Sequence, residues 1–345
     1  MAAPSLRASG PIVLSCALVS AALRQLLLAR GKRALVPWGP RRLALAIAQA
    51  VNKAVRLAGV EFECDTEEKW NGDPEKRLDP QRQYITPWHP HGALTFCAAF
   101  YTNIMTTQST MPGAPGPRNW FVGIADLLFR FPGLGEALLL WNARPVSEAT
   151  SQKVLKSGYS YAIQPGGIPE QVVTDHRREL LVFPPTGGFC RLAVQHGVPL
   201  VPIYAFGENQ VFSTSGTGRR AVNRIYKTMG IAVPLIRPWP NPITVYMKWG
   251  RPVEVGPAEA KPSQERVQEV FGRYVKELAR LFEEHHRTCL PADVAARGLT
   301  VMWRGHSKEE LDVLLDGAGL ERDQVPSLVT VSGQSAPPKL LQSRL

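Results

Sequence analysis

The sequence predicts an α/β fold in which a mixed, largely parallel sheet is flanked by helices and preceded by a membrane-associated N-terminal segment. Three observations indicate this. From Tyr84 onward, short apolar runs alternate with glycine or proline turns and with helical stretches. The 345 residues are 44% hydrophobic, which is enough for a sizeable core and excludes a disordered chain. The first 60 residues contain no acidic side chain.

The positive charge of the chain is concentrated at its N-terminus. The formal net charge is +11, which taken alone is typical of nucleic-acid-binding proteins. However, the first acid is Glu61, and residues 1–60 alone carry a charge of +9. The remaining 285 residues carry 31 basic and 29 acidic side chains. Because the body is nearly neutral, we expect no nucleic-acid partner and interpret residues 1–60 as a basic membrane-anchor or targeting segment.

Two stretches within this segment favour membrane attachment. Residues 11–29 are mostly apolar but are interrupted by Arg24, so the length is marginal for a bilayer span. A short signal-anchor, a hairpin insertion, a signal-peptide core and an organelle transit peptide all remain open. Residues 41–60 are predicted to form an amphipathic helix whose cationic side chains suit an anionic membrane surface. A helix that simply packs on the core is the alternative.

The elements after this segment follow from apolar runs and turn residues. Residues 61–83 are dense in charge, proline and glycine, and we expect a linker there. The expected strands are residues 84–88, 119–123, 159–164, 180–183, 199–206 and 243–249. The expected helices are residues 94–105, 124–131, 149–157 and 189–196. Together these elements predict one domain over residues 84–290.

The clearest helix is predicted over residues 263–287, where apolar side chains recur at spacings of three and four. A further helix is expected from Ser307, where a capping box begins. Residues 291–345 are otherwise interpreted as a C-terminal extension with a loose tail. The five scattered cysteines form no Cys-x-x-Cys pair, which argues against a disulfide framework and a cysteine-based zinc site.

The strongest candidate for chemistry is the motif His89-Pro90-His91-Gly92, which follows an expected strand. Strand ends are where α/β proteins place functional groups. An imidazole near its ordinary pKa can accept a proton from a hydroxyl at neutral pH. A general base, a pair of metal ligands and two structural histidines on a turn remain open. We expect no metal, because no further cluster of metal-ligating residues has suitable spacing.

A glycine pair after the expected strand 159–164 is the second candidate. Gly166 and Gly167 can bring backbone N–H groups close to a substrate oxygen, as an oxyanion hole or a phosphate site requires. Glu170, which follows them, can orient a histidine or a hydroxyl. A plain turn with a surface glutamate is the alternative.

Two more segments carry candidate binding residues. Gly188 and Phe189 open an expected helix, and Arg191 within it could contact a phosphate or simply be solvated. Glu208 and Asn209 follow the strand 199–206, where either a binding site or a hydrogen-bonded turn would explain such a polar pair.

These segments, in this order, resemble the diacylglycerol O-acyltransferase type 2 family, which includes monoacylglycerol and wax-alcohol acyltransferases. His89-Pro90-His91-Gly92 resembles the hallmark motif of that family. The stretch 166–170 resembles its Gly-Gly-x-x-Glu segment, the stretch 188–202 its Gly-Phe block, and the stretch 206–209 its Phe-Gly-Glu-Asn motif. The likeness covers roughly residues 84–290. It implies an acyltransferase-like mixed sheet.

The resemblance also implies an activity. We expect acyl-CoA-dependent acylation of a neutral glyceride hydroxyl, above all conversion of diacylglycerol to triacylglycerol. Monoacylglycerol, a wax alcohol, a lysophospholipid, or a non-catalytic lipid-binding role are the alternatives. Acyl-CoA would be a co-substrate, without a further cofactor. The expected location is the endoplasmic reticulum membrane and lipid droplets, or else a plastid or other organelle membrane.

The expected catalytic residues are His89, His91 and Glu170. One imidazole would act as general base and the other would hold the base or the intermediate. The residues expected to contact substrate or oxyanion are Gly92, Gly166, Gly167, Gly188, Phe189, Arg191, Glu208 and Asn209.

Overall fold

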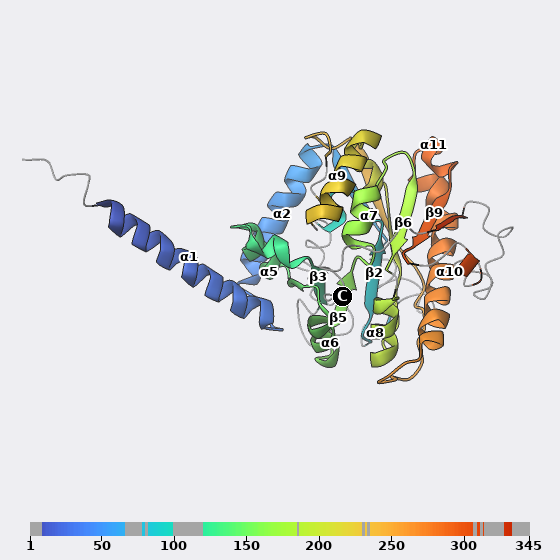
Figure 1. Ribbon diagram of the computed structural model, residues 1–345, viewed down its shortest axis with the longest axis horizontal. Coiled ribbons are helices and arrows are strands. Elements are labelled where there is room, and N and C mark those ends of the chain that lie inside the picture. Colours follow the sequence, from blue (N-terminus) through green and yellow to red (C-terminus); the bar gives the residue numbers. More distant parts are fainter. Residues whose placement is uncertain are drawn as a thin grey trace, which may run out of the picture.

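A mixed sheet of seven strands and a smaller parallel sheet of three strands organise the protein (Figure 1). The computed structural model describes residues 9–65, 78–79, 82–98, 120–184, 186–229, 232, 235–305, 309–310, 313 and 328–332. The central sheet, with helices around it, confirms the predicted α/β class.

The seven-stranded sheet has the order β1-β8-β7-β2-β5-β3-β4. Its strands are β1 (Val60–Cys64), β2 (Ile85–His89), β3 (Trp120–Ile124), β4 (Ala143–Pro145), β5 (Ser160–Ile163), β7 (Ile203–Phe206) and β8 (Ile243–Trp249). All neighbouring pairs are parallel except β7 and β8. Therefore β7, β2 and β5 present their carboxyl ends at one edge of the sheet.

The second sheet consists of β6 (Glu179–Phe183), β9 (Leu299–Trp303) and β10 (Leu328–Ser332), with β9 in the middle. Part of the expected C-terminal extension thus belongs to a sheet, because β9 pairs with β6 along its whole length. The apolar side chains of Leu299, Val301 and Trp303 are buried, which explains why this stretch is a strand.

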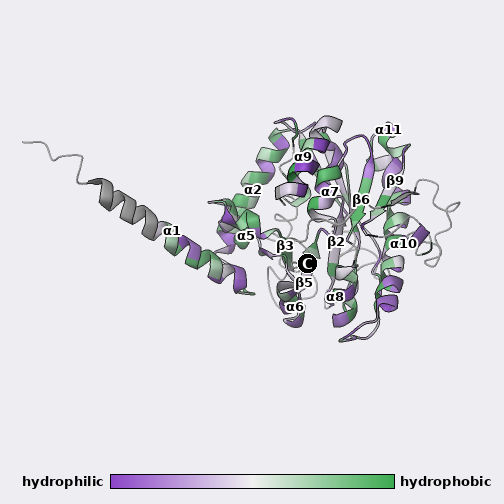
Figure 2. Ribbon diagram, in the orientation of Figure 1, coloured by the Kyte–Doolittle hydropathy of each residue, from purple (hydrophilic) through white to green (hydrophobic). Residues whose placement is uncertain are grey.

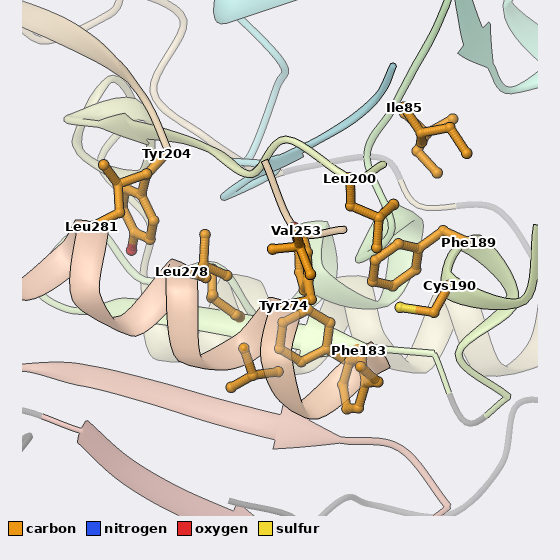
Figure 3. Packing of buried hydrophobic residues seen from close by; sticks show 14 of the residues in the cluster. Ile85, Phe183, Phe189, Cys190, Leu200, Tyr204, Val253, Tyr274, Leu278 and Leu281 are labelled. Carbon is orange, nitrogen blue, oxygen red and sulfur yellow. The ribbon is translucent and has the colours of Figure 1, made fainter. Parts of the chain in front are cut away.

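The helices lie around the sheets. They are α1 (Ser9–Arg33), α2 (Arg41–Leu57), η1 (Asp126–Arg130), α5 (Leu134–Leu140), α6 (Glu148–Lys156), α7 (Gly167–Val173), α8 (Gly188–His196), η2 (Glu208–Gln210), α9 (Gly216–Met229), α10 (Gln264–Cys289) and α11 (Ala292–Ala295). The long helix α10 packs against α8 and β7 with an apolar stripe, as its periodicity predicts. Figure 3 shows Tyr274 of α10 near Phe183 of β6 and Phe189 of α8, with Leu278 further along the same helix.

Most expected elements agree with the structure, and the differences have local causes. The expected helix 124–131 is the short 3-10 helix η1, followed by α5. Pro132 and Gly133, whose φ is +78°, separate the two elements. The expected linker begins later than residue 61, because Val60–Cys64 form β1. Burial alternates along this strand, as in a half-buried edge strand. The expected helix at 94–105 is described only up to Ala98, and Ser307 lies outside the described residues.

The N-terminal helices pack on the body through the C-terminal half of α1. Leu28 is buried against α2 and α5, in a cluster with Ala44, Leu139 and Trp141. Two ion pairs add to this contact: Arg24 to Glu136 at 2.6 Å and Lys32 to Asp126 at 2.8 Å. The rest of α1 reaches away from the body in Figure 1. A search of the described residues finds no helix with the length and hydropathy to cross a membrane.

Candidate active site

Three neighbouring strands of the seven-stranded sheet bring the candidate residues together. His89 is the last residue of β2. On one side, β5 leads into the Gly166-Gly167 turn and α7, which carries Glu170. On the other side, β7 leads into Glu208 and Asn209 of η2. Because these strands are parallel neighbours, segments far apart in the sequence meet at one edge.

The buried carboxylate of Glu170 links the two histidines to the second sheet. Its Oε1 accepts a hydrogen bond from the backbone N–H of His91 at 2.5 Å. Its Oε2 accepts a hydrogen bond from the backbone N–H of Val182 in β6 at 2.7 Å. The same Oε2 lies 3.5 Å from Nδ1 of His89, and both side chains are buried. Glu170 therefore fixes the loop that follows β2, residues 90–97, which we call the motif loop. It also puts an acidic group beside the imidazole of His89.

Gly166 is needed for the close approach of this carboxylate. A Cβ at Gly166 would lie 2.4 Å from the carboxyl carbon of Glu170 and 2.7 Å from its Cβ, so any other residue would displace the side chain. Gly167 has φ +50°, and its N–H donates to the carbonyl oxygen of Gln164 at 3.2 Å. The glycine pair therefore makes room for Glu170, while its role as an oxyanion donor stays a prediction.

His91 lies closer to the surface than His89. Its Nδ1 is 3.3 Å from the hydroxyl of Thr95, which in turn donates to Oε1 of Gln164 at 3.1 Å. Burial lowers the pKa of His91, and the charge of Glu170 partly opposes this effect. The imidazole is therefore neutral at pH 7 and able to accept a proton.

Glu208 holds the other end of the motif loop. Its Oε1 accepts from the N–H of Phe96 at 2.6 Å, and its Oε2 accepts from the N–H of Cys97 at 3.1 Å. Burial raises the pKa of Glu208 to about 8, although these amides lower it. Gly92, with φ +68°, packs on this side chain, because a Cβ there would be 3.0 Å from Cγ of Glu208. Gly92 and Glu208 thus position the loop.

A third buried acid, Glu179, was missed by the sequence reasoning. It opens β6, where Tyr204 donates to its Oε2 at 2.7 Å and Gln210 to its Oε1 at 2.9 Å. Asn209 also donates to Oε2, at 3.3 Å. Burial raises the pKa of Glu179 to about 7. The signal available in the sequence was a glutamate at the start of the apolar run 180–183, although a surface position would fit it equally well.

The remaining predicted residues make no contact with the histidines among those described. Phe189 is buried and packs edge-on against Tyr274, with ring centroids 5.0 Å apart. Gly188 is exposed at the start of α8. Arg191 is directed to the start of α10, where it donates to the carbonyl oxygen of Pro262 and to Gln264. Its expected contact with a phosphate stays a prediction, and its contacts here hold α8 to α10.

Comparison with known proteins assigns this site to a family. A sequence model of the diacylglycerol acyltransferase family matches residues 73–295, which include all the strand-edge residues described above. This chain belongs to the diacylglycerol acyltransferase family. Its resemblance to that family, stated from the motifs, is therefore confirmed, and the protein is an acyltransferase. No solved structure matches the chain.

Individual relatives of this acyltransferase match over part of their length. The 2-acylglycerol O-acyltransferase 3 of Homo sapiens is 30% identical over 234 residues, which are 61% of this chain and 67% of the relative. The 2-acylglycerol O-acyltransferase 1 of Bos taurus is 31% identical over 230 residues, or 60% and 67%. The diacylglycerol O-acyltransferase 2 of Xenopus tropicalis is 31% identical over 235 residues, or 60% and 62%.

The arrangement suits acid–base chemistry in this acyltransferase. Among the described residues, neither ring nitrogen of His89 has a hydrogen-bond partner, although the ring is buried beside Glu170 and Phe183. A buried polar atom without a partner is costly, so it calls for an explanation, and a catalytic role is one. In the part of the chain that the structure describes, no group of three His, Cys, Asp or Glu side chains could hold a metal ion.

Proposed function

We propose that this acyltransferase transfers a fatty acyl chain from acyl-CoA to the free hydroxyl of diacylglycerol, giving triacylglycerol and CoA. The observation that carries the proposal is the buried imidazole of His89, which lies 3.5 Å from the carboxylate of Glu170 and whose nitrogens have no hydrogen-bond partner in the described part of the chain. An imidazole paired with a buried carboxylate is suited to remove a proton from a hydroxyl. The relatives named above act on diacylglycerol or 2-acylglycerol, as their names state.

A neutral acceptor suits the surroundings of the histidines. Burial raises the pKa of Glu208 to about 8, so this side chain is mostly uncharged at pH 7. The rings of Phe183 and Tyr274 flank His89, at centroid distances of 5.1 and 6.3 Å. Among the described residues, the two imidazoles contact acidic, polar and aromatic groups. This environment favours a glyceride hydroxyl over a phosphate-bearing lysophospholipid.

The proposed reaction proceeds by addition and elimination. A ring nitrogen of His89 takes the proton as the acceptor oxygen forms a bond to the thioester carbonyl carbon. The resulting imidazolium is stabilised by the charge of Glu170. The C–S bond then breaks, and the imidazolium returns the proton to the CoA thiolate. His91 is the second candidate for the base, because it is neutral and nearer to the surface.

An acceptor panel tests the proposal. Microsomes containing the full chain are incubated with labelled acyl-CoA and with diacylglycerol, 2-acylglycerol, a fatty alcohol or a lysophospholipid. We expect labelled triacylglycerol, and a loss of about 10²–10⁴-fold in rate for His89→Ala. His196→Ala is the matched control, since this histidine on α8 contacts Gln152 of α6. Equal rates for wild type and His89→Ala would exclude His89 as the base, and faster labelling of another acceptor would reassign the substrate.

We also propose that the protein works at the surface of the endoplasmic reticulum membrane or a lipid droplet, with plastid or other organelle membranes as the alternative. The support is a set of exposed apolar side chains on elements that lie together, namely Leu23, Leu26 and Leu27 of α1, Leu43 of α2, Leu127 and Leu128 of η1, and Phe131 and Leu134 beside them. We call this set the apolar patch. Figure 2 shows α5 mostly apolar and α2 striped.

Vesicle co-sedimentation and imaging test the proposed location. The double variant Phe131→Asp/Leu134→Asp should bind vesicles of mixed neutral and anionic phospholipid less well than wild type. Trp239→Asp, at an exposed apolar position outside the apolar patch, is the matched control. Equal losses in the two variants would contradict the assignment of this surface. Imaging of the tagged full chain distinguishes the endoplasmic reticulum from other organelles.

A further inference from the structure

A group of positively charged side chains surrounds the segment that follows α7. Asp175 lies at its centre and contacts Arg219 at 2.9 Å, Arg177 at 3.3 Å and His176 at 3.8 Å. The guanidinium of Arg237 is close enough to His176 to affect its protonation. Arg219 comes from α9 and Arg237 from the segment before β8, so three parts of the chain converge here.

The positive charges in this group outnumber the carboxylate that they share. Arg178 also approaches Asp175, at 3.9 Å, and its side chain is 46% exposed. The side chain of Arg177 is 55% exposed, and Arg237 is exposed as well. Burial lowers the pKa of His176, and the charges of the neighbouring arginines lower it further, against the opposing effect of Asp175. The surface is therefore strongly positive and open to an anion from solvent.

This group, which we call the arginine cluster, is joined to the strand-edge site by hydrogen bonds. The hydroxyl of Thr174 donates to the carbonyl oxygen of Glu170 at 3.0 Å. Gln210 donates both to the carbonyl oxygen of His176, at 3.2 Å, and to Glu179. Thr174 and Asp175 come directly after α7, whose residue Glu170 lies beside His89. In Figure 1, α7 and α9 lie together above β2, and the two helices are in contact.

We infer that the arginine cluster binds the phosphate groups in the 3′-phospho-ADP part of acyl-CoA. The inference rests on the proposed function, which makes acyl-CoA the donor. Guanidinium groups suit phosphate because their N–H donors match two of its oxygens. With the nucleotide held at the surface, the flexible pantetheine arm can carry the thioester to His89. Arg191, by contrast, is already engaged with Pro262 and Gln264.

A phospholipid headgroup presents the same phosphate chemistry. The location of the exposed apolar side chains favours CoA, because the apolar patch lies on α1, α2, η1 and α5, whereas the arginine cluster lies around α7 and α9. The cluster is also connected to the carbonyl oxygen of Glu170, at the edge where the thioester must react. The experiment therefore has separate arms for the two sources of phosphate.

Donors with and without the nucleotide test the inference. The full chain in microsomes is assayed with oleoyl-CoA and with oleoyl-pantetheine, which lacks the phosphates. The double variant Arg177→Glu/Arg237→Glu should raise the KM for oleoyl-CoA by about tenfold or more, because contacts to its phosphates are lost. The KM for oleoyl-pantetheine should stay unchanged. In the wild type, 3′,5′-ADP should compete with oleoyl-CoA. Lys156→Glu, an exposed charge reversal on α6 at the opposite edge of the body, is the control and should behave as wild type.

Each result has one meaning. An unchanged KM for oleoyl-CoA, or an equal rise for both donors, overturns the inference. An unchanged KM combined with weaker binding to anionic phospholipid vesicles reassigns the cluster to a headgroup and also overturns it. If the wild type transfers oleate from neither donor to any acceptor, the proposed function itself fails, which is a different outcome from a change in KM.

Discussion

Replacing Glu170 by glutamine removes the negative charge beside His89 while keeping the size of the side chain. Two unit charges at the 3.5 Å between Nδ1 of His89 and Oε2 attract each other by about 5 kcal/mol at an effective dielectric constant of about 20. The attraction matters when the imidazolium forms, so its loss should lower kcat by about 10²–10⁴-fold. The carboxamide also has one acceptor oxygen for two backbone donors, His91 and Val182. The unsatisfied donor should lower the free energy of unfolding by about 1–3 kcal/mol.

The assay measures kcat at saturating oleoyl-CoA and diacylglycerol, with the amount of folded protein determined by limited proteolysis. Glu136→Gln is the matched control, because Glu136 also accepts a backbone N–H, from Gly133, and pairs with Arg24 away from the histidines. We expect the control to keep kcat within about threefold of wild type. A folded Glu170→Gln protein with kcat equally close to wild type would refute a role for this charge in the reaction.

Two further predictions concern the motif loop and its acids. Gly92→Ala should lower the free energy of unfolding by about 1–3 kcal/mol more than Gly158→Ala, in denaturant titrations. Both glycines have positive φ. A Cβ at Gly158 has no described neighbour within 4 Å, whereas one at Gly92 contacts Glu208. Equal losses of stability in the two variants would contradict this role of Gly92. A further prediction concerns pH. Burial raises the pKa of Glu208 to about 8 and that of Glu179 to about 7, so the native protein keeps protons that the unfolded chain releases above pH 4.5. Their stabilising contribution is therefore complete below pH 4.5. It is lost as pH rises to about 7 for Glu179 and about 8 for Glu208, by about 1.4 kcal/mol per pH unit for each group. Plotted against pH over this range, the urea midpoint should fall less steeply for Glu208→Gln than for the wild type. An equal slope would disprove the raised pKa of Glu208.

Residue patterns predicted the strands that carry the site, because their apolar runs are short and bounded by glycine or proline. The expected strand 84–88 is β2 at Ile85–His89, and the expected strand 243–249 is β8. The motif residues His89, His91 and Glu170 could be brought together from the sequence, since each follows a strand and parallel strands end at one edge. The interaction of Glu170 with Val182 was not accessible, because it depends on how the second sheet packs on the first.

What the sequence did not reveal depends on contacts between distant segments. The burial of Glu179 is decided by Tyr204 and Gln210, which lie more than twenty residues away. Arg191 looks like a free cation in the sequence, yet α10 supplies its partners. Strand β9 lies beyond the region of the family motifs, and its place is set by pairing with β6. In each case the local pattern was compatible with a solvated or unpaired position, and contacts with distant segments decided the outcome.

The attachment of α1 has a mechanical consequence. Its described contacts with the body lie between Arg24 and Arg33. They combine the buried Leu28, two partly exposed ion pairs of about 0–1 kcal/mol each, and hydrogen bonds from Arg24 to the carbonyl oxygen of Phe131 and from Lys153 to that of Arg33. A helix whose described contacts all lie near one end can change its angle to the body by rearranging that one set of contacts. At the membrane or droplet surface proposed above, α1 would then meet flat and strongly curved lipid at different angles. The strand edge that carries His89 would keep the same internal geometry on both surfaces.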